Sequence, residues 1–199
     1  SRGEIIAIAG VNGAGKSTLA RMLCGLQKNG SGTVLWAGKP MSRRLRRKKA
    51  YMVMQDVGHQ LFTDSVAAEC ALGIKAPNKD EIDRTLEKVD LLAYKERHPL
   101  SLSGGQMQRL AVVVSDICGK ELLVFDEPTS GLDLKSMEEV GTLTRSLATQ
   151  GKVLLIITHD IEFMMRICTR ILFIRDGEIV EDLSGGQKEK IVRLLRGEE

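Results

Sequence analysis

The stretch GVNGAGKST at residues 10–18 constrains the fold of this chain more than any other feature. It follows an apolar run directly and precedes a helix-forming run, so the pattern predicts a strand, a phosphate-binding loop and a helix in succession. Gly10, Gly13 and Gly15 permit a tight bend that points several N–H groups at one place. The N-terminus of the following helix adds partial positive charge, which favours a bound phosphate group.

The side chains of this loop match the chemistry of a nucleotide site. The Lys16 ammonium can contact the β and γ phosphates, the Ser17 hydroxyl can ligate Mg²⁺, and Thr18 can reach an inner phosphate. The alternative is a glycine-rich turn in an ordinary α/β protein, which the full motif in its correct context disfavours. The predicted nucleotide-binding residues of the loop are Asn12, Gly13, Ala14, Gly15, Lys16, Ser17 and Thr18.

Apolar runs of strand length alternate with longer amphipathic runs along the rest of the chain. Several are almost continuously apolar, as in strands covered on both faces of a parallel sheet. The predicted strands cover residues 4–9, 50–54, 121–126, 153–158 and 171–174, and the predicted helices cover residues 16–25, 80–89, 104–118, 135–149 and 160–169. Residues 55–103 indicate a mostly helical insertion, and RDGE at residues 175–178 predicts a hairpin turn. The fold class is therefore α/β with a mostly parallel central sheet.

The composition narrows the possible functions. With 43% hydrophobic residues, a chain of 199 residues can bury the core of one domain, whereas 4% aromatic residues argue against a base-stacking platform for nucleic acid. The basic run at residues 41–49 is therefore predicted to be a solvated segment, and no nucleic-acid partner is expected. The four cysteines form no CxxC pair, which indicates reduced thiols, and the apolar runs are too short to cross a bilayer.

Two acids and a histidine follow the apolar strands. Asp126 and Glu127 end the run LLVFDE, at the edge of the sheet where α/β proteins bind ligands. We expect Asp126 to hold Mg²⁺ through its water shell and Glu127 to orient or deprotonate an attacking water. His159 ends the next strand in the same way, where it can sense the γ phosphate and help to position the water.

The motifs of this chain, taken in sequence order, resemble those of the nucleotide-binding subunit of an ABC transporter, and the resemblance covers nearly the whole chain. GVNGAGKST corresponds to the Walker A motif, Gln55 in MVMQD to the Q-loop, and LSGGQMQR at residues 102–109 to the signature. LLVFDEPTSGLD at residues 122–133 contains both the Walker B motif and the D-loop, and THD corresponds to the H-loop. The resemblance implies a P-loop NTPase with a helical subdomain inserted between the Q-loop and the signature. It predicts a single domain with a RecA-like core at residues 1–55 and 119–182, a helical subdomain at about 56–118 and a C-terminal helix at about 186–197.

The pentapeptide LSGGQ occurs twice, at residues 102–106 and 183–187. The first copy precedes Walker B, as the family signature does, with Ser103 as the helix N-cap. Its helix is predicted to bury one apolar face made of Met107, Leu110, Ala111, Val114, Ile117 and Cys118. The second copy is interpreted as a turn and cap before a final helix. We interpret its likeness to the signature as a coincidence. The nucleotide-binding residues expected from the signature and D-loop are Ser103, Gly104, Gly105, Gln106 and Asp133.

The resemblance implies an ATPase that binds ATP and Mg²⁺ at the interface of two such subunits or domains. Each ATP is expected to lie between one Walker A loop and the Ser103 loop of the opposite subunit, with Asp133 at the interface. Gln55 is expected to contact Mg²⁺ or the water and to report nucleotide state to the helical subdomain. A groove beside it would receive a short helix of an integral membrane partner, which places the ATPase at the cytoplasmic face of the cell membrane. The dimer can be a homodimer or a heterodimer.

A weaker resemblance concerns residues 55–69, which are similar to energy-coupling-factor importers of vitamins and transition-metal ions. Those importers often pair two different ATPases, sometimes fused. The chain begins without Met, and it lacks the upstream aromatic residue that stacks on adenine in the family, so we expect one part of a longer protein. The rival hypotheses are a non-transport ABC ATPase acting in translation or DNA repair and a non-hydrolysing module. The short stretch at residues 55–103 disfavours the coiled-coil DNA-repair type, and Glu127 with His159 disfavours the module.

Overall fold

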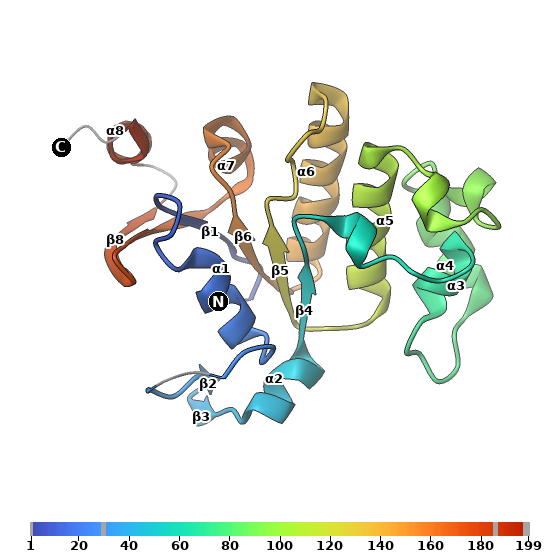
Figure 1. Ribbon diagram of the computed structural model, residues 1–199, viewed down its shortest axis with the longest axis horizontal. Coiled ribbons are helices and arrows are strands. Elements are labelled where there is room, and N and C mark those ends of the chain that lie inside the picture. Colours follow the sequence, from blue (N-terminus) through green and yellow to red (C-terminus); the bar gives the residue numbers. More distant parts are fainter. Residues whose placement is uncertain (1, 29–30, 185–186, 197–199) are drawn as a thin grey trace.

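A computed structural model describes residues 2–28, 31–184 and 187–196. Its main sheet has six strands in the order β4-β5-β6-β1-β7-β8 (Figure 1). The strands are β1 (Ile5–Ala9), β4 (Ala50–Val53), β5 (Leu122–Asp126), β6 (Val153–Ile157), β7 (Arg170–Arg175) and β8 (Glu178–Ser184). β8 pairs antiparallel with β7 through the predicted hairpin, and all the other neighbours are parallel. This confirms the predicted α/β class with a mostly parallel sheet.

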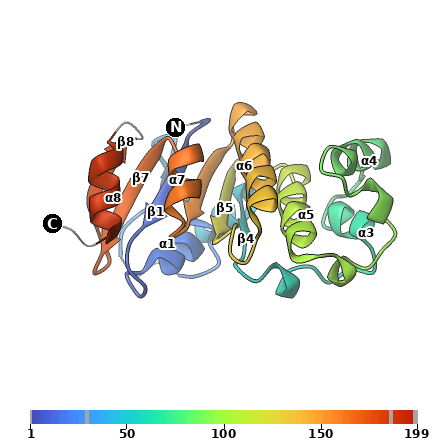
Figure 2. The same ribbon diagram turned by 90° about the horizontal axis from the view of Figure 1, so that it is seen from above.

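Helices cover both faces of the sheet, as seen from above in Figure 2. They are α1 (Lys16–Leu23), α5 (Gly104–Ile117), α6 (Leu134–Thr149), α7 (Ile161–Ile167) and α8 (Lys188–Arg196). Alternate residues of β1 enter opposite clusters: Ile6 and Ile8 pack with α1, whereas Ile5 and Ala7 pack with α5, α6 and α7. Two-sided burial explains why the strands read as continuous apolar runs. Within the described part of the chain, no helix has both the length and the apolar character needed to cross a membrane.

Residues 55–103 are all described and contain no strand, as predicted. Their elements are η1 (Val57–His59), α3 (Val66–Ala71), α4 (Lys79–Glu87), η2 (Leu92–Tyr94) and η3 (Pro99–Ser101), where η marks a 3₁₀-helix. They share an apolar cluster with α5 that is separate from the two clusters of the sheet. This helical part lies at the β4 end of the molecule (Figure 1).

The prediction of one apolar face on α5 was too narrow. Five successive residues from Leu110 to Val114 are buried. Ala111 and Val112 belong to the sheet core, whereas Leu110, Val113 and Val114 belong to the cluster of the helical part. The helix is apolar on more than one side because it lies between two cores.

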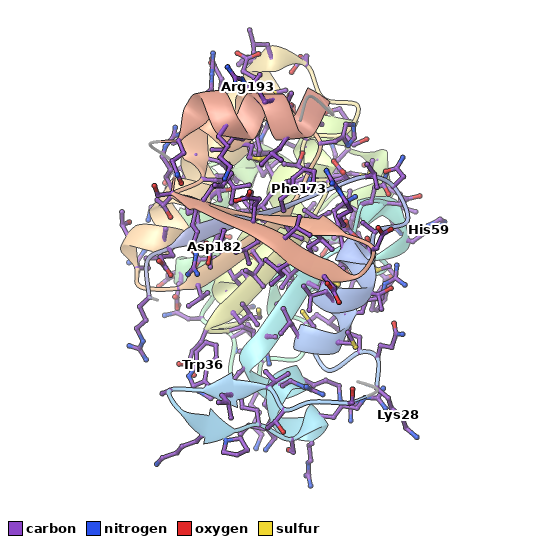
Figure 3. All side chains as sticks on the ribbon, turned by 90° about the vertical axis from the view of Figure 1, so that its left-hand side faces the viewer. Lys28, Trp36, His59, Phe173, Asp182 and Arg193 are labelled. Carbon is purple, nitrogen blue, oxygen red and sulfur yellow. The ribbon has the colours of Figure 1, made fainter. Side chains whose placement is uncertain are left out.

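The sequence patterns also missed a hairpin and a helix near the basic run. The hairpin pairs β2 (Leu35–Trp36) with β3 (Lys39–Pro40), and two-residue strands are too short to show alternation. The helix is α2 (Arg43–Lys49), in the segment predicted to be solvated. Arg46 is buried, and Lys49 forms an ion pair with Glu121 and lies over the Trp36 ring (Figure 3 labels Trp36). The run is therefore partly structural, because one side of α2 faces the protein.

A buried carboxylate fixes the loop that follows η1. Glu69, in α3, is buried, and its Oε2 accepts hydrogen bonds from the N–H groups of Phe62 (3.1 Å) and Thr63 (3.0 Å). The Thr63 hydroxyl donates a third at 2.8 Å. The loop is thereby held in a shape that leaves the Phe62 side chain 68% exposed.

We expect Glu69→Ala to lower the free energy of unfolding by about 2–3 kcal/mol, because three partly buried donors lose their acceptor. Urea denaturation measures the change. Glu87→Ala, at an exposed position of α4, serves as the control and should change stability by less than about 0.5 kcal/mol. Equal losses in the two variants would mean that the carboxylate of Glu69 does not stabilise the loop.

Candidate functional site

A cavity of about 880 Å³ lies at the carboxyl ends of the central strands. The side chains that line it come from segments far apart in the sequence, because parallel strands deliver their ends to the same edge of the sheet. The predicted residues that line it are Asn12, Gly13, Gly15, Lys16, Ser17, Thr18, Gln55, Asp126, Glu127 and His159. Ala14 does not line it: its side chain is buried against the α1 side of the sheet, and its N–H donates to the Val11 carbonyl.

The loop between β1 and α1 already has the shape of a phosphate cradle. Gly13 and Gly15 have φ angles of 84° and 97°, in the left-handed region that favours glycine. The Lys16 ammonium donates to the carbonyls of Gly10 at 2.7 Å and Val11 at 2.9 Å. These bonds hold the charge at the mouth of the loop, beside the N-terminus of α1, where a phosphate group would be stabilised.

Asp126 and Ser17 meet at the floor of the cavity, where the Ser17 Oγ lies 3.4 Å from the Asp126 Oδ1. Burial raises the pKa of the Asp126 carboxyl, and so does Glu127, whereas the Ser17 hydrogen bond lowers it. Gln55 also lines the cavity, so the oxygen atoms available there include a carboxylate, a hydroxyl and an amide oxygen, the hard ligands that Mg²⁺ prefers. The described residues contain no group of three or more His, Cys, Asp or Glu that could enclose a metal.

Glu127 and His159 form a pair at the cavity wall. The Glu127 φ angle is 51°, an uncommon value for a residue other than glycine and a local strain of the kind found at functional sites. Its side chain is 13% exposed, and its Oε1 lies 2.8 Å from the His159 Nδ1. The His159 side chain is 80% exposed, so it can reach a ligand in the cavity while it contacts Glu127.

The signature and D-loop residues lie elsewhere. Ser103, Gly104, Gly105, Gln106 and Asp133 are not among the residues that line the cavity. Ser103 and Gln106 form a reciprocal capping box at the start of α5, which leaves the two intervening glycine N–H groups at the open end of the helix. The single chain therefore does not bring these residues to the phosphate loop.

The starts of α5 and α6 lie side by side. A Cβ added to Gly105 would come 2.5 Å from the Ser136 Oγ, so only glycine allows this approach without a shift of Ser136. Asp133 caps α6 by accepting from the Ser136 N–H at 2.8 Å, and that hydrogen bond lowers the pKa of its carboxyl. Arg109 of α5 forms an ion pair with Glu139 of α6. Two helix N-termini, each with its own cap, thus share one surface.

Several lining residues were not predicted: Thr158, Ile161, Phe173, Ile174, Arg175 and Leu194. Figure 3 labels Phe173 beneath α8. Arg175 ends β7 at the same edge of the sheet at which Asp126 ends β5. Its position at the end of a predicted strand is the sequence signal that could have identified Arg175 as a lining residue.

The second LSGGQ copy lies at the end of β8, which includes Leu183 and Ser184. Its glycines, at residues 185 and 186, lie outside the described residues, so the predicted turn and cap is only partly testable. The Ser184 N–H donates to the Gln187 Oε1 at 3.2 Å.

Comparison with known proteins gives consistent matches. The family model described as ABC transporter matches residues 1–130. An ABC transporter ATP-binding protein of Treponema denticola is 59% identical over 193 residues, which cover 97% of this chain and 40% of that protein. A relative with the same description from Streptomyces avermitilis is 37% identical over 195 residues, which cover 94% of this chain and 73% of that protein. The chain thus spans about two fifths of the first of these relatives.

Two solved structures share the fold. The first, cbiO1 from Clostridium perfringens, is described as part of the ABC transporter complex cbiONQ; it superposes with a TM-score of 0.84 at 30% identity, over 99% of this chain and 83% of that one. The second, a nucleotide-free ATP-binding cassette from an ABC transporter, has a TM-score of 0.84 at 21% identity, over 96% and 85% of the two chains. At that identity, the second match shows the fold alone.

Proposed function

The chain belongs to the ABC transporter family of ATP-binding proteins, a family of ATPases, and from this premise we propose that it binds and hydrolyses ATP to power transport across a membrane. The observation that carries the proposal is the convergence of Lys16, Asp126 and Glu127 on one cavity. A charged phosphate cradle, a magnesium ligand and a general base are the parts that phosphoryl transfer to water requires.

Each residue of the cavity has a distinct part in the proposed reaction. The loop N–H groups and the Lys16 ammonium hold the phosphates. Ser17, Gln55 and Asp126 would hold Mg²⁺, which would neutralise charge that develops on the phosphates. The Glu127 carboxylate takes a proton from the attacking water. His159 keeps this carboxylate in place through the 2.8 Å contact, and its exposed ring would be available to the γ phosphate.

We place the signature residues in the site of a partner subunit or domain. The capped N-termini of α5 and α6 lie outside this chain's own cavity, yet the open end of α5 suits an anion. A second ATPase facing the first can bring its Ser103 loop and Asp133 to the ATP held here. ATP then joins the two halves, and hydrolysis removes the charge that bridges them.

We further propose a membrane partner that docks beside Gln55. Met54, which precedes Gln55, and three residues of the helical part, Phe62, Leu72 and Leu100, have exposed apolar side chains. Such a surface can receive the apolar face of a short helix. The ATPase would then lie peripherally at the cytoplasmic face of the cell membrane. The similarity to cbiO1 and the resemblance of residues 55–69 support an energy-coupling-factor importer of a vitamin or metal ion.

An arginine substitution in each LSGGQ copy tests whether two chains enclose ATP between them, because only the first copy is expected to contact the partner's ATP. In a Glu127→Gln background, which slows hydrolysis, Mg-ATP should produce a dimer that light scattering detects. Ser103→Arg should weaken this dimer by about 100-fold or more, because it removes the cap of α5 and places a bulky side chain where the phosphate of the partner's ATP would lie. Ser184→Arg, at the exposed end of β8, should leave the dimer unchanged.

Binding of ATP without dimer formation would overturn a homodimer of this chain alone, and the test would then use the chain copurified with its partner. Equal loss in both variants would overturn the assignment of the first copy as the signature. Failure of the unmodified chain to bind ATP at all would overturn the proposed function.

A further inference from the structure

A glutamine side chain completes the open edge of β4. In the sheet order, β4 is the outermost strand and has β5 on one side, so its other edge faces the helical part. Gln60, which follows η1, reaches this edge. Its Nε2 donates to the Met52 carbonyl at 2.8 Å, and its Oε1 accepts from the Met54 N–H at 3.0 Å.

These two bonds reproduce the pairing of a parallel strand. In a parallel ladder, one residue of the neighbouring strand bonds the carbonyl before and the N–H after the residue that it faces. Here the carboxamide of Gln60 bonds the carbonyl of Met52 and the N–H of Met54, on either side of Val53. A carboxamide can do so because it carries both a donor and an acceptor. It thereby covers an edge whose backbone groups would otherwise need another partner.

The second Nε2 hydrogen gives Gln60 a further anchor. It donates to the Tyr51 hydroxyl at 3.0 Å, and the Tyr51 ring packs against both the sheet core and the cluster of the helical part. The orientation of the amide is therefore determined by three partners. A side chain tied at three points loses most of its rotamer freedom, so it can act as a rigid link.

This link closes a short loop that contains Gln55. The loop leaves β4 at Met54 and returns to the same point through the Gln60 side chain. Inside it, the Asp56 Oδ1 accepts from the Gly58 N–H at 3.1 Å, which stabilises the 3₁₀ turn. Gln55 is exposed and lines the nucleotide cavity. Closing the loop at Met54 restricts the positions that the adjacent Gln55 can reach.

We infer that Gln60 is a positioning residue: its carboxamide pairs with the free edge of β4 and so holds Gln55 at the nucleotide cavity. The consequence for hydrolysis rests on the proposed function, whereas the edge pairing itself does not. Gln60 is not among the residues that line the cavity, whereas Gln55 is, so Gln60 acts through Gln55.

The test compares Gln60→Met with His59→Ala in the whole protein. Methionine preserves the length of the side chain and removes both bonds to β4. His59 lies on the same turn, is largely exposed and pairs with Asp56, so its replacement controls for disturbance of η1. Hydrogen exchange at the Met54 amide should accelerate about tenfold or more in Gln60→Met and stay unchanged in His59→Ala.

Steady-state kinetics then separate positioning from simple structural support. In Gln60→Met, kcat should fall about tenfold, while the Kd for ATP without Mg²⁺ should stay within about twofold. Gln60→Glu keeps an acceptor for the Met54 N–H but has no donor for the Met52 carbonyl. It should therefore preserve slow exchange at Met54 and retain more activity than the methionine variant.

Unchanged exchange at Met54 in Gln60→Met would overturn the pairing. Faster exchange with an unchanged kcat would overturn the positioning role. If the unmodified protein binds ATP without hydrolysing it, the proposed function fails, and Met54 exchange alone then decides whether Gln60 completes the β4 edge.

Discussion

Glu127→Gln should slow ATP hydrolysis by about 10²–10³-fold and leave ATP affinity within about twofold. Glutamine keeps the shape of the side chain but cannot take a proton from water. The carboxylate lies at the cavity wall with its side chain 13% exposed, so bulk water cannot easily replace it as a base. Phosphate release and the binding of a fluorescent ATP analogue measure the two quantities separately.

The matched control is Glu121→Gln, which alters a glutamate just before β5 rather than just after it. Glu121 pairs with Lys49 and Arg2, far along the strand from the cavity. We expect its replacement to change kcat by less than about twofold, since surface ion pairs contribute little. Loss of ATP binding in Glu127→Gln would contradict the assignment of Glu127 as a base and indicate a role in binding.

Gly10→Ala should destabilise the protein by about 3 kcal/mol or more and abolish ATP binding. A Cβ at this position would come 2.1 Å from the Ile174 carbonyl oxygen, and the φ angle of 143° is strained for any other residue. The clash is with the backbone of β7, so a side-chain rotation cannot relieve it. The phosphate loop begins at Gly10, and the shift would therefore displace the Lys16 partners as well.

The control variant is Gly73→Ala, which introduces backbone strain without a steric clash. Gly73 also has a positive φ angle, 76°, but nothing lies within 4 Å of an added Cβ. This variant should lose only about 1 kcal/mol in urea denaturation and keep its ATP affinity. Similar losses in the two variants would mean that the contact between Gly10 and Ile174 is not what requires glycine.

Much of the site was predictable because its chemistry is local or periodic. The phosphate loop is one contiguous stretch between a strand and a helix, and the acids Asp126 and Glu127 directly follow an apolar run. Parallel strands place such ends at one edge, so the convergence with His159 at the cavity could be expected. These side chains do line one cavity. Their roles in hydrolysis stay predictions.

Other features had weak or no sequence signals. The two-residue strands β2 and β3 are too short for alternation to appear, and Arg46 is buried within a run of cations that reads as solvated. The breadth of the buried surface of α5 depends on a second core, which its own periodicity does not reveal. Burial of these residues depends on which elements lie next to them.

By itself, the sequence determined the α/β class, the phosphate loop, the strand-end acids and the order of the motifs, because each is encoded within a few neighbouring residues. Only the tertiary structure decided that Gly10 faces the Ile174 carbonyl, that Glu127 takes a positive φ angle, and that Gln60 pairs with the edge of β4. It also placed Ser103 and Asp133 together at two helix N-termini outside the cavity. Such features arise where segments distant in the chain meet, or where a side chain replaces a strand, and local periodicity carries no record of either.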